Sequence, residues 1–222
     1  MTERDLLQRA EDLETDLERA QHMFDEFLTG CRALHDVGRA VTIFGSARFP
    51  EDHRYYQLAR DTGRRLAEAG YAVITGGGPG IMEAANRGAR EAGGLSIGCT
   101  IVLPEEQTSN PYLDREIAFD YFFVRKVMLM KYSSGFICMP GGVGTLDEIF
   151  ETGTLIQTGK APRFPLVVMG YEFWKPLRMF IRTTMFQEGT IDEGEVVPLY
   201  TDDPNEAVAL IQAANGVKPE DG

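Results

Sequence analysis

Two glycine-rich turns are the segments of this sequence best suited to chemistry. Residues 75–80 (TGGGPG) and 139–148 (MPGGVGTLDE) each follow an apolar run and precede a helical pattern. Glycines let the backbone approach a ligand closely, and the free amides at a helix start point toward an anion. In a doubly wound sheet both turns open at the carboxyl ends of strands, where such sheets bind ligands. The two turns together predict a phosphate site in one crevice.

Neither turn matches a common nucleotide fingerprint. Read as G-x-G-x-x-G from Gly76, the first turn has Ile81 in the last position, and the next strand ends in CTIV without the acid that NAD sites use. The second turn lacks the Gly-Lys-Ser/Thr ending of a P-loop. Each turn also has a purely structural explanation. The first could simply allow a helix and a strand to pack tightly, and in the second Thr145 and Glu148 have the spacing of a capping box. Dinucleotide oxidoreduction and nucleoside triphosphate hydrolysis are therefore disfavoured.

A basic pair, Arg125 and Lys126, lies between the two turns in the sequence. We expect it where a strand passes into a helix, on the same edge of the sheet as the turns. A guanidinium there can hold a phosphate or carboxylate through two hydrogen bonds. An isolated basic pair is usually a solvated surface feature, and only the neighbouring turns favour a role in binding.

Composition limits the class of protein and its partners. The chain has 222 residues with 43% apolar and 25% charged content, which is typical of a globular α/β domain. The net charge of −12 argues against nucleic-acid polymers and anionic membranes. We find no signal peptide, no membrane span and no C-x-x-C pair, and the three histidines have no metal-ligand spacing. The expectation is a cytoplasmic protein with reduced cysteines and neither a metal nor a cofactor.

Hydrophobic periodicity predicts a Rossmann-like, doubly wound, mainly parallel α/β fold with an extra N-terminal helix. A heptad-like stripe favours one long helix over residues 3–29, ending at Gly30, which either packs on its own domain or joins subunits. We divide the chain into that N-terminal helix (1–36), one nucleotide-binding domain (37–215) and a disordered tail (216–222). Strands are predicted at 41–46, 72–75, 96–102, 118–124, 135–139, 165–169 and 196–200. Helices are predicted at 55–69, 81–92, 125–132, 146–158, 174–187 and 204–214, and residues 103–112 are predicted to form part of a lid.

Together these motifs resemble the "Lonely guy" family of cytokinin riboside 5′-monophosphate phosphoribohydrolases. The resemblance rests on GGGPGIMEAANRGA, the Arg125-Lys126 pair and PGGVGTLDE, and it extends from about Val41 to about Leu210. Members have often been labelled lysine decarboxylases, but this sequence shows no pyridoxal-phosphate site. The resemblance implies hydrolysis of the N-glycosidic bond of a purine nucleoside 5′-monophosphate, giving free base and ribose 5-phosphate. It also implies a homodimer or a larger homo-oligomer.

The resemblance also implies roles for individual residues. Arg125 and Glu148 match the family's proposed catalytic residues. Matched substrate contacts are Glu83, Lys126, Gly141, Gly142, Val143, Gly144, Thr145, Leu146, Asp147 and Thr154. To these we add Ser46 after the first strand and Gly78 and Gly80 of the first turn.

The chemistry of the reaction suits these residue types. Breaking a glycosidic bond builds positive charge on the sugar, so a carboxylate near the anomeric carbon stabilises it, attacks it or activates water. We expect the helix dipole and nearby cations to keep Glu148 ionised. Glu83 is expected to reach the ribose hydroxyls or the base. The alternative is a nucleotide- or cofactor-binding carrier of the same fold, which would not need Glu148.

Overall fold

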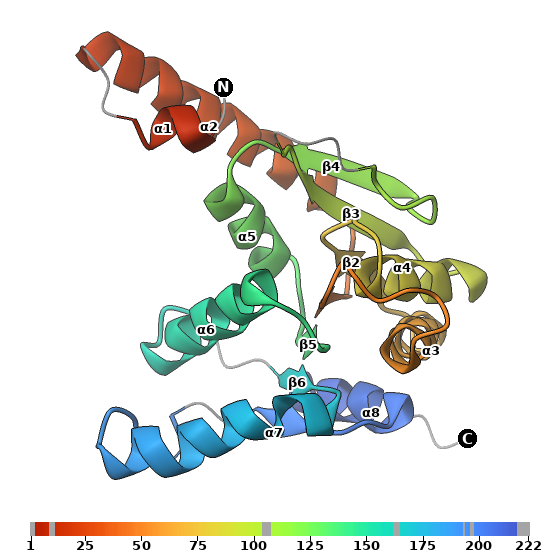
Figure 1. Ribbon diagram of the computed structural model, residues 1–222. Helices are drawn as coiled ribbons and strands as arrows, with labels where there is room; N and C mark the ends of the chain where they lie inside the picture. The colour runs from red at the N-terminus through yellow and green to blue at the C-terminus, as the bar shows by residue number, and fades with distance from the viewer. Residues whose placement is uncertain are drawn as a thin grey trace.

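The computed structural model describes residues 3–8, 12–103, 108–161, 165–192, 194–195 and 198–216. Within them, seven strands form one sheet in the order β4-β3-β2-β1-β5-β6-β7, and every neighbouring pair is parallel (Figure 1). The strands are β1 (Ala40–Phe44), β2 (Ala72–Thr75), β3 (Ser96–Ile101), β4 (Arg115–Phe119), β5 (Phe136–Cys138), β6 (Leu166–Val168) and β7 (Leu199–Tyr200). The predicted Rossmann-like α/β fold is confirmed.

Helices cover both faces of the sheet. One layer contains α3 (Arg54–Glu68), α4 (Ile81–Glu91) and α8 (Pro204–Ala214). The other contains α2 (Leu13–Leu34), α5 (Phe122–Lys131), α6 (Val143–Gln157) and α7 (Tyr171–Met179). Figure 1 shows α3 and α4 on one side of the sheet and α5 and α6 on the other. Alternate side chains of each buried strand therefore enter different cores, as parallel sheets require.

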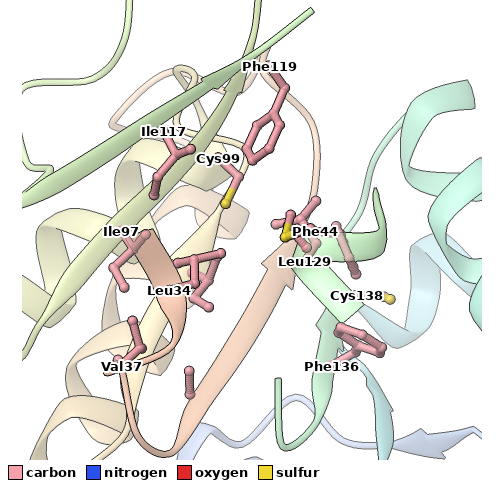
Figure 2. Close-up of a cluster of buried hydrophobic side chains, with 14 of the residues drawn as sticks. Leu34, Val37, Phe44, Ile97, Cys99, Ile117, Phe119, Leu129, Phe136 and Cys138 are labelled. Carbon is pink, nitrogen blue, oxygen red and sulfur yellow. The ribbon is translucent and has the colours of Figure 1, made fainter. Parts of the chain in front are cut away.

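The two cores lie on opposite faces of the sheet. In β1, Val41 and Ile43 pack with α3, α4 and α8, whereas Ala40 and Phe44 pack with α2 and α5. Figure 2 shows the second core, in which Leu34 of α2 joins Phe119, Leu129 and Phe136. The C-terminal half of α2 is thus part of the domain.

The single helix predicted over residues 3–29 is wrong in two respects. The described residues form a short α1 (Glu3–Leu6) and then α2, which begins after Asp12, whose carboxylate accepts a hydrogen bond from the Thr15 amide at 2.9 Å. Gly30 does not end the helix. A Cβ there would lie 2.9 Å from the Met128 side chain, so the glycine is needed for close packing against α5.

A second correction concerns the strand predicted at 118–124. The strand ends at Phe119, and the apolar run 122–124 instead forms the first turn of α5. Arg125 therefore lies at the fourth position of a helix rather than at a strand end. The helix predicted at 174–187 begins at Tyr171 and continues beyond Met179 as a π-helix, Phe180–Met185.

Some predictions lie outside the described residues. These include residues 104–107 of the predicted lid, 217–222 of the predicted tail and 196–197 of the last predicted strand. In the part of the chain that is described, no helix is long and apolar enough to cross a membrane.

Candidate active site

A cavity of about 540 Å³ opens at the carboxyl edge of the sheet. Its walls come from the segments that follow β1, β2 and β3 and from α5 and α6. The strand order reverses direction between β1 and β5, and doubly wound sheets bind ligands at this switch point. The cavity is therefore where this topology places a ligand site.

The open start of α6 forms one wall of the cavity. Gly142 is the N-cap residue, and no side chain in the described part of the chain caps the helix. The amides of Thr145 and Leu146 donate to the Gly142 carbonyl at 3.1 and 3.0 Å. Gly142, Val143 and Gly144 are exposed and line the cavity. The uncapped amides and the helix dipole make this an anion-binding position.

The capping box predicted for Thr145 and Glu148 does not form. The helix begins three residues earlier than expected, so Thr145 is its third residue and Glu148 its sixth. Thr145 instead packs against Gly141, where a Cβ would meet its hydroxyl oxygen at 2.1 Å. Glu148 is consequently free of a capping role and lies on the face of α6 that borders the cavity.

Arg125 and Glu148 face each other in the cavity wall. Nη2 of Arg125 lies 3.7 Å from Oε1 of Glu148, and their side chains are 14% and 7% exposed. This separation is longer than a hydrogen bond. Nε of Arg125 is buried without a hydrogen-bond partner among the described residues, and the Phe122 ring lies 5.1 Å from the guanidinium carbon. Both charged groups therefore retain capacity to bind a ligand.

Burial dominates the electrostatics of this pair. It raises the pKa of Glu148 to about 7, although the positive charges of Arg125 and Lys126 partly oppose the shift. Burial also lowers the pKa of Arg125, while Glu148 acts in the opposite direction. The expectation that the dipole and nearby cations keep Glu148 fully ionised did not allow for burial: removal from water outweighs its cationic neighbours, so with a pKa of about 7 the carboxyl is partly protonated at neutral pH.

Lys126 is not among the residues that line the cavity. Its Nζ lies 3.2 Å from Asp147 Oδ2 and 2.7 Å from Glu151 Oε2, both on α6. Burial alone would lower the pKa of Lys126, but the hydrogen bonds that its ammonium group donates to Glu151 and Asp147 outweigh burial, so the pKa lies above its usual value. Thr154 is exposed and donates to the Phe150 carbonyl at 2.7 Å. Gly141, Leu146, Asp147 and Thr154 do not line the cavity in this chain.

The first glycine turn is fixed by buried amide side chains. Nδ2 of Asn110 donates to the carbonyls of Gly77 and Gly78 and to Oδ1 of Asn86, each at 3.1 Å. The Thr75 hydroxyl donates to Oδ1 of Asn86 at 2.6 Å and accepts from the Gly77 amide at 2.9 Å. This network holds Gly77 and Gly78 against the cavity. Because its members are distant in sequence, no local pattern predicts it.

The start of α4 is more covered than the start of α6. The Ile81 amide donates to the Ser46 carbonyl at 2.9 Å. Gly80 has φ 69°, and a Cβ there would lie 2.5 Å from the same carbonyl, so only glycine fits. Ser46 and Gly78 line the cavity, whereas Gly80 and Glu83 do not. Glu83 accepts a hydrogen bond from Tyr56 at 2.8 Å instead.

Sequence reasoning missed much of the lining. The missed residues are Ile43, Phe44, Gly45, Ala47, Arg48, Met82, Thr100, Ile101, Phe122 and Leu129. Gly76 and Gly77 of the predicted first turn also line the cavity, as do Leu103, Thr108 and Ser109 of the predicted lid. Apolar side chains are frequent among them, which gives the cavity room for an uncharged planar group beside its charged end. Within the described residues, no group of three or more His, Cys, Asp or Glu residues is placed to hold a metal ion.

In sequence, the chain is similar to one protein family and to several proteins that share a name. The model of the family described as "Possible lysine decarboxylase" matches residues 82–211. A cytokinin riboside 5′-monophosphate phosphoribohydrolase of Mycobacterium tuberculosis is 30% identical, covering 68% of this chain and 79% of its own. A cytokinin riboside 5′-monophosphate phosphoribohydrolase from Oryza sativa is 33% identical, and the match covers 70% of this chain and 64% of the Oryza protein. An uncharacterized Archaeoglobus fulgidus protein is 36% identical, covering 50% and 74%.

Solved structures share the fold. A molybdenum cofactor carrier protein from Chlamydomonas reinhardtii has 25% identity and a TM-score of 0.56, covering 80% of this chain and 96% of its own. The molybdenum cofactor binding protein of Rippkaea orientalis has 21% identity and a TM-score of 0.55, covering 79% and 94%. The second of these likenesses shows the fold alone.

Proposed function

The chain belongs to the family described as possible lysine decarboxylases, the Lonely guy family, and from that premise we propose that it is a nucleoside 5′-monophosphate phosphoribohydrolase. The substrate is a purine nucleotide with adenine or N6-modified adenine as its base. Water replaces the base on the sugar, and the products are the free base and ribose 5-phosphate. The names of the sequence relatives support this reaction class.

One observation carries the catalytic proposal. Among the described residues that line the cavity, Glu148 is the only carboxylate, and it faces Arg125 beside the open start of α6. With the 5′-phosphate on the uncapped amides of 142–144, the sugar extends toward Glu148. A carboxylate there stabilises the positive charge that develops as the glycosidic bond breaks. Both direct attack on the sugar and activation of water remain compatible with this placement.

Arg125 has two uses in this arrangement. Its Nε, which has no hydrogen-bond partner among the described residues, and its guanidinium edge can bind a phosphate oxygen with charge-assisted hydrogen bonds. Its positive charge also favours the ionised form of Glu148. A pKa of about 7 then lets Glu148 exchange protons at neutral pH, which suits general acid–base catalysis.

The described cavity does not suit amino-acid decarboxylation through a Schiff base. No lysine is among the residues that line it. The nearby Lys126 amine is paired with Asp147 and Glu151. The family's descriptive name therefore has no counterpart in this site.

A non-catalytic carrier is the second candidate, because a molybdenum cofactor carrier shares the fold at 25% identity. A carrier needs the anion position but has no use for a buried carboxylate beside it, since an unneutralised charge weakens anion binding. The Arg125–Glu148 pair therefore favours the enzyme.

We also propose a homodimer formed through the α2, α5, α6 and α7 layer. Large exposed apolar side chains occur on those four helices, among them Leu17, Phe24, Phe123, Phe150 and Phe173. Helices α3, α4 and α8 expose none. An apolar surface that is present on one helical layer and absent from the helices of the other is typical of a subunit interface.

Release of free base from a panel of nucleoside monophosphates tests the activity. Glu148→Gln should still bind AMP but lose turnover by about 10²- to 10⁴-fold, the range typical of a general acid or base. Glu172→Gln removes an exposed carboxylate on α7 and serves as the matched control. Unchanged adenine release by Glu148→Gln would refute the catalytic role, and binding without any turnover by the wild type would support the carrier.

A further inference from the structure

Helices α1 and α2 lie beside the start of α5, the helix that carries Arg125 (Figure 1). The N-cap residue of α5 is Tyr121, and it makes no side-chain capping bond. The first amides of any helix lack partners within that helix. The start of α5 therefore needs acceptors from elsewhere in the chain.

Two carboxylates from the N-terminal helices supply these acceptors. Oε1 of Glu26 accepts a hydrogen bond from the amide of Asp120, the residue before the N-cap, and the Glu26 carboxylate also accepts one from the amide of the N-cap residue Tyr121. Oε2 of Glu3 accepts one from the Phe122 amide at 3.3 Å. Negative charge at this position also complements the positive end of the α5 dipole.

A third contact fixes the same junction. Nε2 of His22 lies 2.9 Å from Oδ2 of Asp120, and its ring packs edge-on against Tyr121 at 5.5 Å between centroids. Further along α2, Gly30 allows close contact with Met128 of α5. The two helices are thus joined at both ends.

The capped junction lies directly before Arg125. The Arg125 amide donates to the Tyr121 carbonyl at 3.1 Å, which is the first hydrogen bond of α5. The Phe122 amide donates its hydrogen bond to Glu3, and the centroid of the Phe122 ring lies 5.1 Å from the guanidinium carbon of Arg125. A shift of the helix start would therefore move the guanidinium relative to Glu148.

We infer that the N-terminal segment positions the catalytic site: Glu26, assisted by Glu3, caps the start of α5 and keeps Arg125 directed into the cavity. Both residues precede the stretch 82–211 that matches the family model, so the role belongs to a part of the chain outside that match. Glu26 is a positioning residue, because it acts through α5 and does not line the cavity. The kinetic test of this inference depends on the proposed function, whereas a second test, by amide hydrogen exchange, does not.

The kinetic test compares Glu26→Ala with Asp25→Ala. Asp25 is the adjacent carboxylate on α2 and is bonded only to Gln21 through its side chain, at 3.0 Å, among the contacts described. Glu26→Ala should raise KM for AMP about tenfold and leave inhibition by adenosine within about twofold, because Arg125 meets the phosphate. Asp25→Ala should change neither. In an Arg125→Ala background, the effect of Glu26→Ala should largely disappear, which a general loss of stability would not cause.

Hydrogen exchange tests the cap even if the protein releases no base. Glu26→Ala should speed exchange of the amides of residues 120–125 at least tenfold relative to wild type, and Asp25→Ala should not. If Glu26→Ala fails to fold, Glu26→Gln retains an acceptor oxygen and Glu3→Ala alters an exposed contact, and each should give a smaller change in the same amides. Equal exchange in all variants would overturn the inference, whereas absent turnover with faster exchange would overturn only the proposed enzyme.

Discussion

Nη2 of Arg125 and Oε1 of Glu148 lie 3.7 Å apart in side chains that are 14% and 7% exposed. The pair is close enough to interact electrostatically and too far apart to form a hydrogen bond. Neither charge is fully compensated in the free protein. A ligand that brings a phosphate to Arg125 and a developing positive charge to Glu148 would complete both interactions.

The rate of hydrolysis should depend on ionisation of Glu148. Because burial raises the pKa of Glu148 to about 7, we expect kcat/KM for AMP to increase with pH through about 7 and then level off. Initial rates of adenine release, at AMP concentrations below KM and between pH 5 and 9, would measure this dependence. The phosphate itself ionises at about pH 6, so inhibition by ribose 5-phosphate over the same range provides the correction. A flat corrected profile would contradict the role of an ionised Glu148.

Glu148→Gln should change the pH dependence of stability. The pKa of Glu148 rises from 4.5 in the reference state to about 7 in the folded protein. The proton-linked stability of the wild type is therefore fully present below about pH 4.5 and is lost as pH rises through about 7. As pH rises between these limits, the wild type loses this stability and Glu148→Gln does not. The free energy of unfolding of Glu148→Gln, measured relative to that of the wild type, should therefore increase by up to about 3 kcal/mol. Urea unfolding at pH 4.5 and 8 measures the gain, and parallel pH curves would argue against it.

Arg125→Ala should weaken nucleoside monophosphates far more than nucleosides. Loss of a charge-assisted contact to phosphate costs about 1.5–3 kcal/mol, which corresponds to roughly 10- to 150-fold in affinity. The substitution also removes the positive charge that lowers the pKa of Glu148, so the pH profile should move to higher pH. Titration with AMP and adenosine measures the first effect. Arg64→Ala, on the opposite helical layer, is the control. Equal losses for both ligands would mean that Arg125 does not read the phosphate.

Local sequence patterns predicted the framework of the fold well. β2 runs from Ala72 to Thr75 and α8 from Pro204 to Ala214, both as predicted, because apolar runs and a Pro start are strong local signals. The run 122–124 was misassigned because three apolar residues fit a strand as well as a helix. Its exposed Phe122 and Phe123 show that tertiary position, rather than hydrophobicity, decided the outcome.

The site was predicted less completely than the fold. The glycine motif located Gly142–Thr145 and Glu148 at the cavity because a turn between strand and helix has one place in a doubly wound sheet. The pairing of Glu83 with Tyr56 and the network around Asn110 depend on long-range contacts. The pKa of Glu148 depends on burial, which a charge count cannot supply.

The Asn86 network should contribute strongly to stability. Asn86 is fully buried, accepts from Thr75 and Asn110, and donates to Ser96 at 2.9 Å. Asn86→Ala would leave several buried polar groups without partners, at about 1–3 kcal/mol for each unsatisfied group. We expect a melting temperature at least about 8 °C lower, measured by calorimetry. Asn205→Ala, at the exposed start of α8, is the control. A loss no larger than that of the control would show that the network is dispensable.

Gly144→Ala should separate stability from ligand binding. Gly144 lies in the first turn of α6, and a Cβ built there meets no atom within 4 Å, so the protein itself tolerates the methyl group. Replacing a helical glycine with alanine should raise the free energy of unfolding by about 0.5–1 kcal/mol. The same methyl group enters the position proposed for the phosphate and should weaken AMP binding at least tenfold. Thermal unfolding and titration with AMP measure the two effects on one sample. Increased stability with unchanged affinity would place the phosphate away from the start of α6.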